Sequence, residues 1–417
     1  MDNSINKIKT DKEKEFLKLS RIDLSPHYID EFIEYYNDQI DKKSKNNNLA
    51  YTIQKKKNNE IGKEEIFFDL AKPNDAETII QIIKDAFTNY PFYEMLDSEY
   101  IRSLIKSENY CVFVFKDKQN KIVGTITFIL DLEKKKGYIR TFAVFKKYWG
   151  KLNIKGVTIS VYLYMYKKYR NQIFIWYSET LTNTAKAQYI FKQCHVEPLA
   201  FFPNKDIFCD KVESEFLQVA YDKKAINDYR SKESPKIIIE VMKPFIYASL
   251  KFNLISVDVT EPKIKLNRKE VLNLEKQFII KEEKDDFNNV KVKMSFSDSN
   301  SYLTFLLTPQ LKNIIDIEYK ISKLEELSVF LNKLTLYLKD NEIRYCECYV
   351  SAYKPSHQRL FQHYGLKPRG YIPSWQYNKK LKIFEDSILF NIFLGEISDK
   401  FECLNEIDLV MNHFTED

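Results

Sequence analysis

Glycine is scarce in this chain: 8 glycines occur among 417 residues, beside 12 prolines. The shortage excludes glycine-rich repeat architectures and makes the position of each glycine informative. No apolar run approaches the roughly 20 residues that a membrane-spanning helix needs. The N-terminal segment "MDNSINKIKTDKEKEFLKL" is polar and charged, unlike a signal peptide. We therefore expect a cytoplasmic protein without a membrane partner.

Cysteine and histidine patterns of metal or redox sites are also missing. The six cysteines form no CxxC pair, and the five histidines show no metal-ligand spacing. Cys346 and Cys348 flank one residue of an expected strand and should point to the same face. We expect buried free thiols and no metal cofactor.

Neither sign of charge dominates. The chain has 65 basic and 59 acidic residues, for a net charge of +6, and the two signs are interspersed. This excludes an obvious nucleic-acid binder and indicates a mildly basic soluble protein. With 44% hydrophobic residues and 15% aromatics, a chain of this length can form two or three domains. The composition does not indicate an oligomeric state.

An internal echo is the most informative feature that is present. The stretch "QYIFKQCHVEPLAFFPN" (188–204) is typical of a helix running into a strand, with His195 where a helix end usually has glycine. The stretch "QRLFQHYGLKPRGYIP" (358–373) resembles it without a gap. The identical pairs are Gln188 and Gln358, Phe191 and Phe361, Pro198 and Pro368, and Pro203 and Pro373. We infer a duplicated unit.

The hydrophobic patterns predict how the chain is divided. Residues 1–61 form a polar extension with a helix inside 23–40 and a loop or linker at 41–48. Residues 62–230 and 236–417 form two further domains. The expected strands of the first lie at 65–71, 110–116, 121–132, 137–145, 172–179 and 214–221, with one more in the stretch quoted above, and its other helices lie at 74–87 (capped by Asn74), 97–107 and 153–170. In the second, strands are expected at 290–296, 301–308, 314–321, 342–350 and 385–393, and a helix at 323–340.

This order of elements resembles the GNAT superfamily of acyl-CoA-dependent N-acyltransferases. "KIVGTITF", with Gly124 early in it, is similar to the third GNAT strand, and "IRTFAV" to the fourth. "FKKYWGK" is similar to the acyl-CoA loop, and "TLTNTAKAQYIFKQCHVEP" to the helix and strand after the fifth strand. The resemblance covers residues 64–222 and implies an α/β (α+β) protein of two tandem GNAT-like units. Each unit would be a mixed, mostly antiparallel sheet flanked by helices, and the second would be degenerate.

The resemblance implies where acetyl-CoA would bind. GNAT proteins hold the pyrophosphate at the N-terminus of the helix after the fourth strand, where backbone N–H groups lack partners. The family pattern is Arg/Gln-x-x-Gly-x-Gly/Ala, and the nearest match here begins at Lys147, includes Gly150 and Lys151, and departs from the pattern at Leu152. One alternative is a loop that closes at Asn153 or Gly156, and another is a decayed loop with solvated lysines. Backbone amides of Phe142, Ala143 and Val144 would hold the pantetheine and polarise the thioester.

Acyl transfer to an amine needs a base and often an acid. Glu179, at the end of the fifth strand, is the candidate base, although a solvated strand-end carboxylate is the plainer interpretation. Asp131 and Glu133 are weaker candidates. In the next helix the family often has a Tyr that acts as the general acid. The aligned residue here is Phe191, which cannot donate a proton. Tyr189 is the remaining candidate acid, and it faces elsewhere on the helix.

The second unit lacks the coenzyme loop. "YKISKLEELSVF" has no glycine, and Glu325 and Glu326 in the first helical turn would repel a pyrophosphate. We expect a structural or substrate-shaping role for this unit, with Trp375 packed between the units.

These features favour an N-acetyltransferase that uses acetyl-CoA as a co-substrate and a small-molecule or peptide amine as acceptor. One alternative is a GNAT-fold transferase that takes its acyl group from aminoacyl-tRNA. This alternative would make tRNA a partner, although the sequence has no basic arm for RNA, and no other nucleic acid is expected to bind. The other alternative is a non-catalytic GNAT-like binding module.

Overall fold

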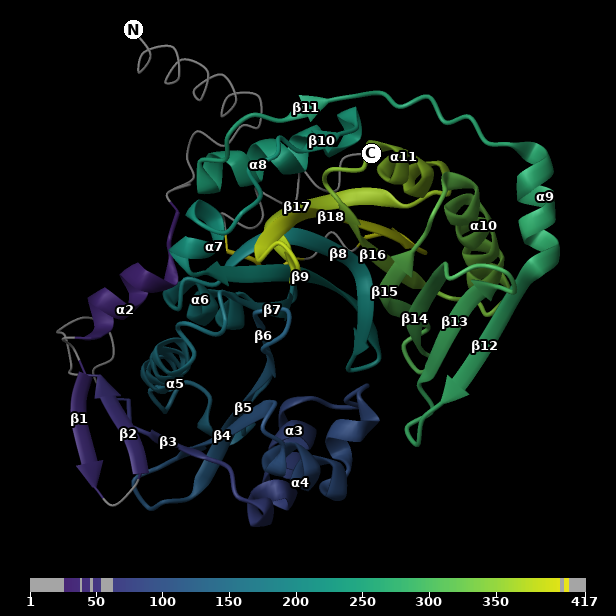
Figure 1. The fold of residues 1–417 in the computed structure, drawn as a ribbon. Helices are drawn as coiled ribbons and strands as arrows, with labels where there is room; N and C mark the ends of the chain where they lie inside the picture. The colour runs from purple at the N-terminus through teal and green to yellow at the C-terminus, as the bar shows by residue number, and fades with distance from the viewer. Residues whose placement is uncertain (1–25, 38–39, 46–47, 54–62, 398–400, 405–417) are drawn as a thin grey trace, which may run out of the picture.

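The computed structural model describes residues 26–37, 40–45, 48–53, 63–397 and 401–404. Within this part of the chain, fourteen strands form one continuous, strongly curved sheet (Figure 1). Its first half consists of β3 (Phe67–Leu70), β4 (Tyr110–Lys116), β5 (Ile122–Asp131), β6 (Lys136–Val144), β7 (Ile175–Leu181), β8 (Glu197–Phe208) and β9 (Lys211–Tyr221). Its second half consists of β12 (Phe278–Lys284), β13 (Val290–Phe296), β14 (Tyr302–Thr308), β15 (Asn313–Lys320), β16 (Tyr345–Ser351), β17 (Lys367–Asn378) and β18 (Ile383–Phe393).

The two halves of the sheet have the same strand order. It runs β3-β4-β5-β6-β7-β9-β8 in the first half and β12-β13-β14-β15-β16-β18-β17 in the second. Neighbouring strands are antiparallel, except that β6 with β7 and β15 with β16 are parallel. The fold class predicted from the sequence, with two units that each contain a mixed and mostly antiparallel sheet, is confirmed.

Helices cover both faces of the first half. Alternate residues of β4 show this, because Val112 and Val114 join the core under α3 and α4, whereas Phe113 and Phe115 join the core under α5. None of the helices in the described part of the chain combines the length and the apolarity that a membrane span requires. The helices of this half are α3 (Ala76–Ala86), α4 (Ser98–Lys106), α5 (Ile154–Lys168), α6 (Ala185–Gln193) and α7 (Lys223–Asn227), with short 3-10 turns at Pro73–Asp75, Tyr93–Leu96 and Lys146–Tyr148.

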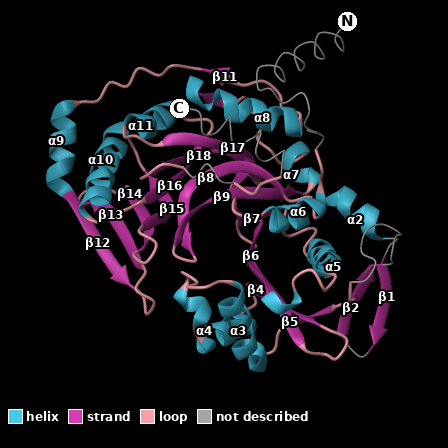
Figure 2. Ribbon diagram, turned by 180° about the vertical axis from the view of Figure 1, so that it is seen from behind, coloured by secondary structure: helices cyan, strands magenta, loops and turns pink. Residues whose placement is uncertain are grey.

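The second half is covered differently. Its first two strands, β12 and β13, are paired and adjacent in the chain, whereas α3 and α4 lie between β3 and β4. Among the described residues the second half therefore has no counterpart of α3 and α4. Its helices pack along the outer side of the sheet (Figure 2). They are α9 (Arg268–Gln277), α10 (Leu324–Asp340) and α11 (Pro355–His363).

The two halves meet at equivalent positions. Gly370 of β17 is paired with Ala200 of β8, and the echo in the sequence places these two residues at the same point of each unit. A Cβ atom on Gly370 would lie 2.2 Å from the Cβ atom of Ala200, so glycine is what permits this approach. Trp375 packs between the halves as predicted, with ring centroids 5.0 Å from Tyr177 and 5.1 Å from Tyr349.

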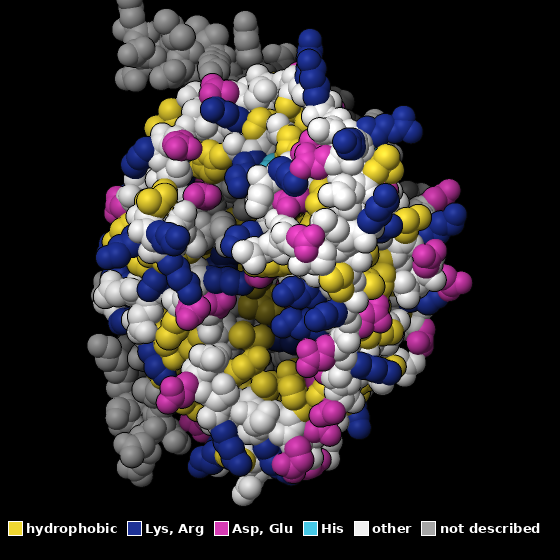
Figure 3. Space-filling model, turned by 45° about the vertical axis from the view of Figure 1, so that its right-hand side comes forward, with side chains coloured by type: hydrophobic (Ala, Val, Ile, Leu, Met, Phe, Trp, Pro, Cys, Tyr) yellow, Lys and Arg dark blue, Asp and Glu magenta, His cyan; other side chains and the backbone are white. Residues whose placement is uncertain are grey.

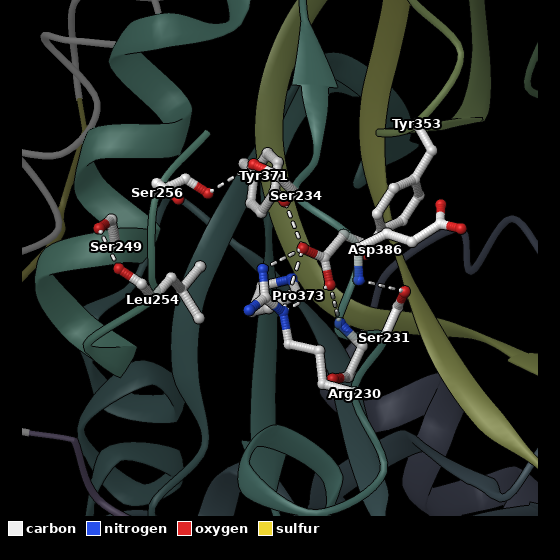
Figure 4. A network of polar contacts seen from close by, with 12 residues as sticks. Arg230, Ser231, Ser234, Ser249, Leu254, Ser256, Tyr353, Tyr371, Pro373 and Asp386 are labelled. Atoms are coloured by element: carbon white, nitrogen blue, oxygen red, sulfur yellow. Dashed lines mark hydrogen bonds and ion pairs between the residues drawn. The ribbon is translucent and has the colours of Figure 1, made fainter. Parts of the chain in front are cut away.

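A polar network ties the connection between the halves to the second half (Figure 4). Arg230, which follows α7, donates from Nη2 to Asp386 of β18 at 2.6 Å and from Nε at 2.9 Å. The Tyr371 hydroxyl donates to the same carboxylate. Further along the connection, the 3-10 turn Ile239–Val241 and α8 (Met242–Phe252) follow β10 (Lys236–Ile237), which pairs with β11 (Asp258–Val259). One hydrophobic core spans residues of both halves and α8.

Three local predictions were wrong. The polar tract 41–48 was predicted as a loop or linker. Its described residues, 41–45 and 48, instead lie in two paired strands, β1 (Ile40–Lys45) and β2 (Asn48–Ile53), which follow α2 (Ile29–Asn37). Strand pairing uses backbone groups, which a Lys/Asn-rich composition does not reveal. The cap of α3 is Asp75 rather than Asn74, because a 3-10 turn precedes the helix. Cys209 is exposed, whereas Cys111, Cys194, Cys346 and Cys348 are buried free thiols as expected.

Candidate active site

β6 and β7 separate halfway along their length. Their parallel pairing runs from Lys136 and Ile175 to Ile139 and Ser178 and is not recorded beyond that point. Immediately afterwards β6 bulges against β5, and Thr141 adopts a φ of 56°. Backbone groups of β6 beyond the bulge that point toward β7 are therefore left without a strand partner.

This separation opens into a cavity of about 1500 Å³. The volume exceeds the range of about 300–1,000 Å³ that is typical of small-molecule pockets. The cavity is lined by both halves: Phe142, Glu179 and Phe191 come from the first, and Leu306, Ile315 and Glu347 from the second. The space-filling view in Figure 3 shows a hollow on the face it draws, with hydrophobic side chains in its depth and Lys and Arg side chains along its rim.

Basic side chains line the end of the cavity near α5 and α6. They are Lys63, Lys155 and Lys186. The helix α5 begins at Ile154, and its cap Asn153 accepts a hydrogen bond from the N–H of Gly156 at 2.9 Å. The sequence allowed the loop before this helix to end at Asn153 or at Gly156, and in the structure it ends at Asn153. This end combines a helix N-terminus with lysines, which is an arrangement that suits an anion.

The residues predicted to bind coenzyme fall into two groups. The predicted strand residues and the loop glycine line the cavity, and Gly150, with a φ of 75°, has open space around it. Lys147 and Lys151 are not among the lining residues. The Nζ of Lys147 lies 5.4 Å and 5.2 Å from the ring centroids of Phe145 and Tyr148. The predicted strand residues are Phe142, Ala143 and Val144.

Glu179, the predicted base, lies on the cavity wall with both carboxylate oxygens engaged. The Nζ of Lys205 donates to its Oε1 at 2.8 Å, and the Tyr138 hydroxyl donates to its Oε2 at 3.2 Å. Lys205 also lies 3.2 Å from Oε2 of Glu347, so one ammonium bridges the two halves. Burial alone lowers the pKa of Lys205, but the neighbouring Glu179 and Glu347 raise it well above its usual value.

The other predicted catalytic residues lie in different places. Tyr189 is 45% exposed and lines the basic end, where Lys155 lies 5.9 Å from its ring centroid. Phe191, in the position where the family often has a Tyr, is buried. Asp131 and Glu133 do not line the cavity. Glu133 instead pairs with Lys379.

Sequence reasoning missed a group of buried charges at the inner end of the cavity. Lys205, Asp206, Glu215 and Glu347 are buried, and together with the exposed Asp316 they line this part of the cavity. One signal could have found Lys205. The echoed prolines, Pro203 and Pro373, begin equivalent bulges in β8 and β17, and a bulge at this point re-aims the side chains that follow.

One family model matches part of the chain. Residues 76–151 match the family described as the Acetyltransferase (GNAT) family. One similar solved structure is the spermidine N-acetyltransferase from Vibrio cholerae in complex with CoA and spermine, with 13% identity, a TM-score of 0.34, and coverage of 39% of this chain and 98% of that chain.

A second similar structure is the ribosomal-protein-S5-alanine acetyltransferase from Vibrio fischeri, with 16% identity, a TM-score of 0.33, and coverage of 40% and 96%. Comparison with curated proteins finds no match. The matched segment runs from α3 through β6 to the loop before α5. The match to the GNAT acetyltransferase family is confined to residues 76–151.

Proposed function

We propose that this protein is an acyl-CoA-dependent N-acyltransferase that transfers acetyl from acetyl-CoA to a primary amine by direct attack. The observation that carries the proposal is the separation of β6 and β7 at the Thr141 bulge, which opens onto a cavity lined by both halves. Lysines stand at one end of this cavity and carboxyl groups at the other. An anionic coenzyme and a cationic amine would therefore approach the opening from opposite ends.

The basic end would hold the coenzyme phosphates. Lys155 and Lys186 line the cavity beside the N-terminus of α5, and Gly150 leaves room for close approach. The pantetheine would extend along β6, where backbone groups face the cavity instead of a strand. A backbone N–H of Phe142 to Val144 would then donate to the thioester carbonyl as negative charge develops on its oxygen.

The transfer would proceed by direct attack of the amine on the thioester. The neutral amine attacks the thioester carbonyl carbon with its lone pair, a C–N bond forms, the C–S bond breaks, and the coenzyme leaves as a thiolate. Glu179 or a water molecule takes the proton that the amine loses, and the thiolate accepts a proton to give free coenzyme A. Because Lys205 holds Glu179, this carboxylate would act best through a water.

A binding-only module is a second candidate. Lys205 and Tyr138 already occupy both oxygens of Glu179, and Phe191 cannot donate a proton. Such a module would bind acetyl-CoA without releasing thiol.

Thermal shift with acetyl-CoA tests the first step. We expect a clear rise in Tm for the native protein, reduced in the double variant Lys155→Ala/Lys186→Ala. The matched control is Lys147→Ala/Lys151→Ala, which removes the same charge outside the cavity lining. A loss confined to the control would overturn the placement of the phosphates, and no shift at millimolar acetyl-CoA would overturn coenzyme binding.

Thiol release with a panel of primary amines tests the second step. We expect turnover in the native protein and a rate at neutral pH that falls in Glu179→Gln while the acetyl-CoA thermal shift stays unchanged. Undiminished turnover would remove Glu179 from the role of base. Binding without turnover for every amine would favour the binding module.

A further inference from the structure

Four carboxyl side chains converge on the inner end of the cavity from both halves of the sheet. Asp206 and Glu215 come from β8 and β9, and Asp316 and Glu347 come from β15 and β16. We call these four residues the acidic pocket. The second half thus supplies two of the four groups, on the side of its sheet where the described residues include no counterpart of α3 and α4.

The buried cation nearest to the acidic pocket is already shared. Lys205 lies within 3.3 Å of carboxylate oxygens of both Glu179 and Glu347. Farther from the acidic pocket, Arg140 lies 3.7 Å from Glu94, and both line the cavity. These two cations of the cavity lining are therefore already paired. Arg344, which is not among the lining residues, donates from Nη2 to the carbonyl oxygens of Lys205 and Leu311, and its charge lowers the pKa of Asp206. The four carboxyl groups of the acidic pocket still outnumber Lys205 and Arg344.

Glu215 is the member of the acidic pocket that the protein leaves unsatisfied. The residue is only 4% exposed, and its Oε2 has no hydrogen-bond partner. Burial, together with the nearby Asp206 and Glu179, raises the pKa of Glu215 well above its usual value. A buried carboxyl oxygen without a partner costs stability, so its presence at a cavity wall points to a ligand that completes it.

The equivalent position of the second half shows that the fold does not need a carboxyl group here. Glu215 faces Leu181 and Phe202 in the sheet, and Ser387 faces Ser351 and Ile372 at the same place of its own half. A small hydroxyl therefore suffices for the strand pairing. Among the described residues, no group of His, Cys, Asp and Glu is arranged to hold a metal ion. The chemistry that remains for a pocket of carboxyl groups is recognition of an organic cation.

We propose that the acidic pocket binds a second, non-reacting ammonium group of the acceptor, so that the acceptor is a diamine or polyamine rather than a monoamine. This inference rests on the proposed acetyl transfer. The reacting amine would lie at the opening of β6 and β7 beside Glu179. Lys205 separates that place from the acidic pocket, because it bridges Glu179 on β7 and Glu347 on β16. Two ammonium groups on one flexible chain would occupy the two places together.

The test compares 1,4-diaminobutane with butylamine, which differ by one ammonium group on the same carbon chain. We expect kcat/KM of thiol release from acetyl-CoA to be about tenfold or more higher for the diamine, since a charge-assisted hydrogen bond in a buried site discriminates by at least this factor. Glu215→Gln and Asp316→Asn should each reduce this preference toward one, chiefly by lowering kcat/KM for the diamine. The matched control is Glu318→Gln, which removes a carboxylate on β15 that pairs with Lys134 outside the cavity lining.

A binding measurement separates this inference from the proposed function. We expect 1,4-diaminobutane alone to raise the Tm of the native protein and of Glu318→Gln, but not of Glu215→Gln, and butylamine to raise none. A diamine shift without turnover of any amine would overturn acetyl transfer and keep the acidic pocket as a cation site. Turnover of both amines with equal kcat/KM and equal Tm shifts would overturn the acidic pocket and keep acetyl transfer.

Glu215→Gln also tests whether the residue is merely structural. Because one oxygen of the native carboxyl group is buried without a partner, we expect the variant to be at least as stable as the native protein while it loses the diamine preference. A variant that is destabilised and loses activity toward both amines to the same extent would contradict the assignment.

Discussion

The N-termini of α5 and α10 occupy the same place in the two halves but are completed differently. In the second half, Glu326 accepts hydrogen bonds from the backbone N–H of Ser322 at 2.7 Å and of Lys323 at 3.2 Å. The hydroxyls of Ser299 and Ser301 donate to the same carboxylate. In the first half, Asn153 caps one N–H, and the loop before it faces the cavity. The chain's own carboxylate thus fills in one half the kind of anion site that the other half leaves accessible.

The fourth and fifth strands also stay paired in the second half and separate in the first. Both fourth strands carry a bulge with a left-handed residue, Thr141 at a φ of 56° and Asp316 at a φ of 55°. In the second half, pairing with the next strand resumes beyond the bulge, at Ile317 and Cys348. In the first half, pairing ends before the bulge. The bulge alone therefore does not make a site, and the loss of pairing beyond it distinguishes the first half.

The largest effect is expected where the two halves meet. A Cβ on Gly370 would lie 2.7 Å from the Cα of Ala200 and 2.9 Å from the carbonyl oxygen of Leu199, which are backbone atoms that cannot move aside cheaply. We expect Gly370→Val to lower the free energy of unfolding by about 4 kcal/mol or more in urea titrations. The reciprocal variant Ala200→Gly should cost at most about 1 kcal/mol. Equal costs would show that the contact between the halves is not tight.

The next effect concerns two equivalent residues with unequal roles. Asp386 accepts from Arg230, Tyr371 and the Ser374 N–H, whereas its counterpart Ser214 accepts from the Asn204 N–H at 2.9 Å. We expect Asp386→Ala to cost about 3–5 kcal/mol of unfolding free energy, because it leaves a buried guanidinium without its partner.

Ser214→Ala is the matched variant and should cost about 1 kcal/mol. Both values come from the same denaturant titrations. A small cost for Asp386→Ala would mean that Arg230 finds another acceptor or water, and that the connection between the halves is held by the shared core instead.

Elements whose structure depends on neighbouring residues could be predicted from the sequence, and those that depend on distant contacts could not. The strand predicted at 290–296 is β13 to the residue, because alternating side chains report directly on a strand with one buried face. The connection that contains α8 was not predicted, since its helix packs on strands far away in the sequence. Gly150 and Glu179 line the cavity as the order of elements suggested, whereas Lys147 and Lys151 of the same loop do not, and the roles predicted for all four stay predictions.

The acidic pocket could not be predicted in that way. Lys205 and Glu347 are 142 residues apart in the chain and meet only because β8 bulges and the two halves join. Glu215 has no sequence neighbour that marks it as a site residue. What identifies it is burial without a partner, which only the assembled fold defines.

A smaller effect would sharpen the comparison of the helix N-termini. Glu326→Ala leaves two backbone N–H groups and two hydroxyls without their acceptor, and we expect a loss of about 2 kcal/mol of unfolding free energy. Asn153→Ala removes one capping hydrogen bond and should cost about 1 kcal/mol. Denaturant titrations measure both losses. In addition, acetyl-CoA should stabilise Glu326→Ala as much as the native protein, because the proposed coenzyme site in the first half is unchanged in that variant. A smaller stabilisation of Glu326→Ala than of Asn153→Ala would contradict the assignment of coenzyme to the first half.

The smallest effect concerns the residue that ends the echoed helix. His195 and Gly365 both adopt a positive φ, of 60° and 92°, although only one of them is glycine. We expect Gly365→Ala to cost about 1 kcal/mol of unfolding free energy, since an L side chain is strained there. His195→Gly relieves the equivalent strain but removes the hydrogen bond from its Nδ1 to the Tyr28 carbonyl at 2.9 Å and the ring contact with Phe32.

In His195→Gly the relief of backbone strain should nearly cancel the loss of the imidazole contacts. We therefore expect global stability to change by less than about 1 kcal/mol while α2 loses its contacts with His195. Hydrogen exchange separates these two effects, because amides of α2 should exchange faster in His195→Gly and at the native rate in Gly365→Ala. Unchanged protection of α2 would show that Tyr28 and Phe32 do not depend on the imidazole. In that case the histidine is tolerated at this position rather than used there. Faster exchange would show that His195, which stands where the second half has a helix-ending glycine, stabilises α2 through its contacts with Tyr28 and Phe32.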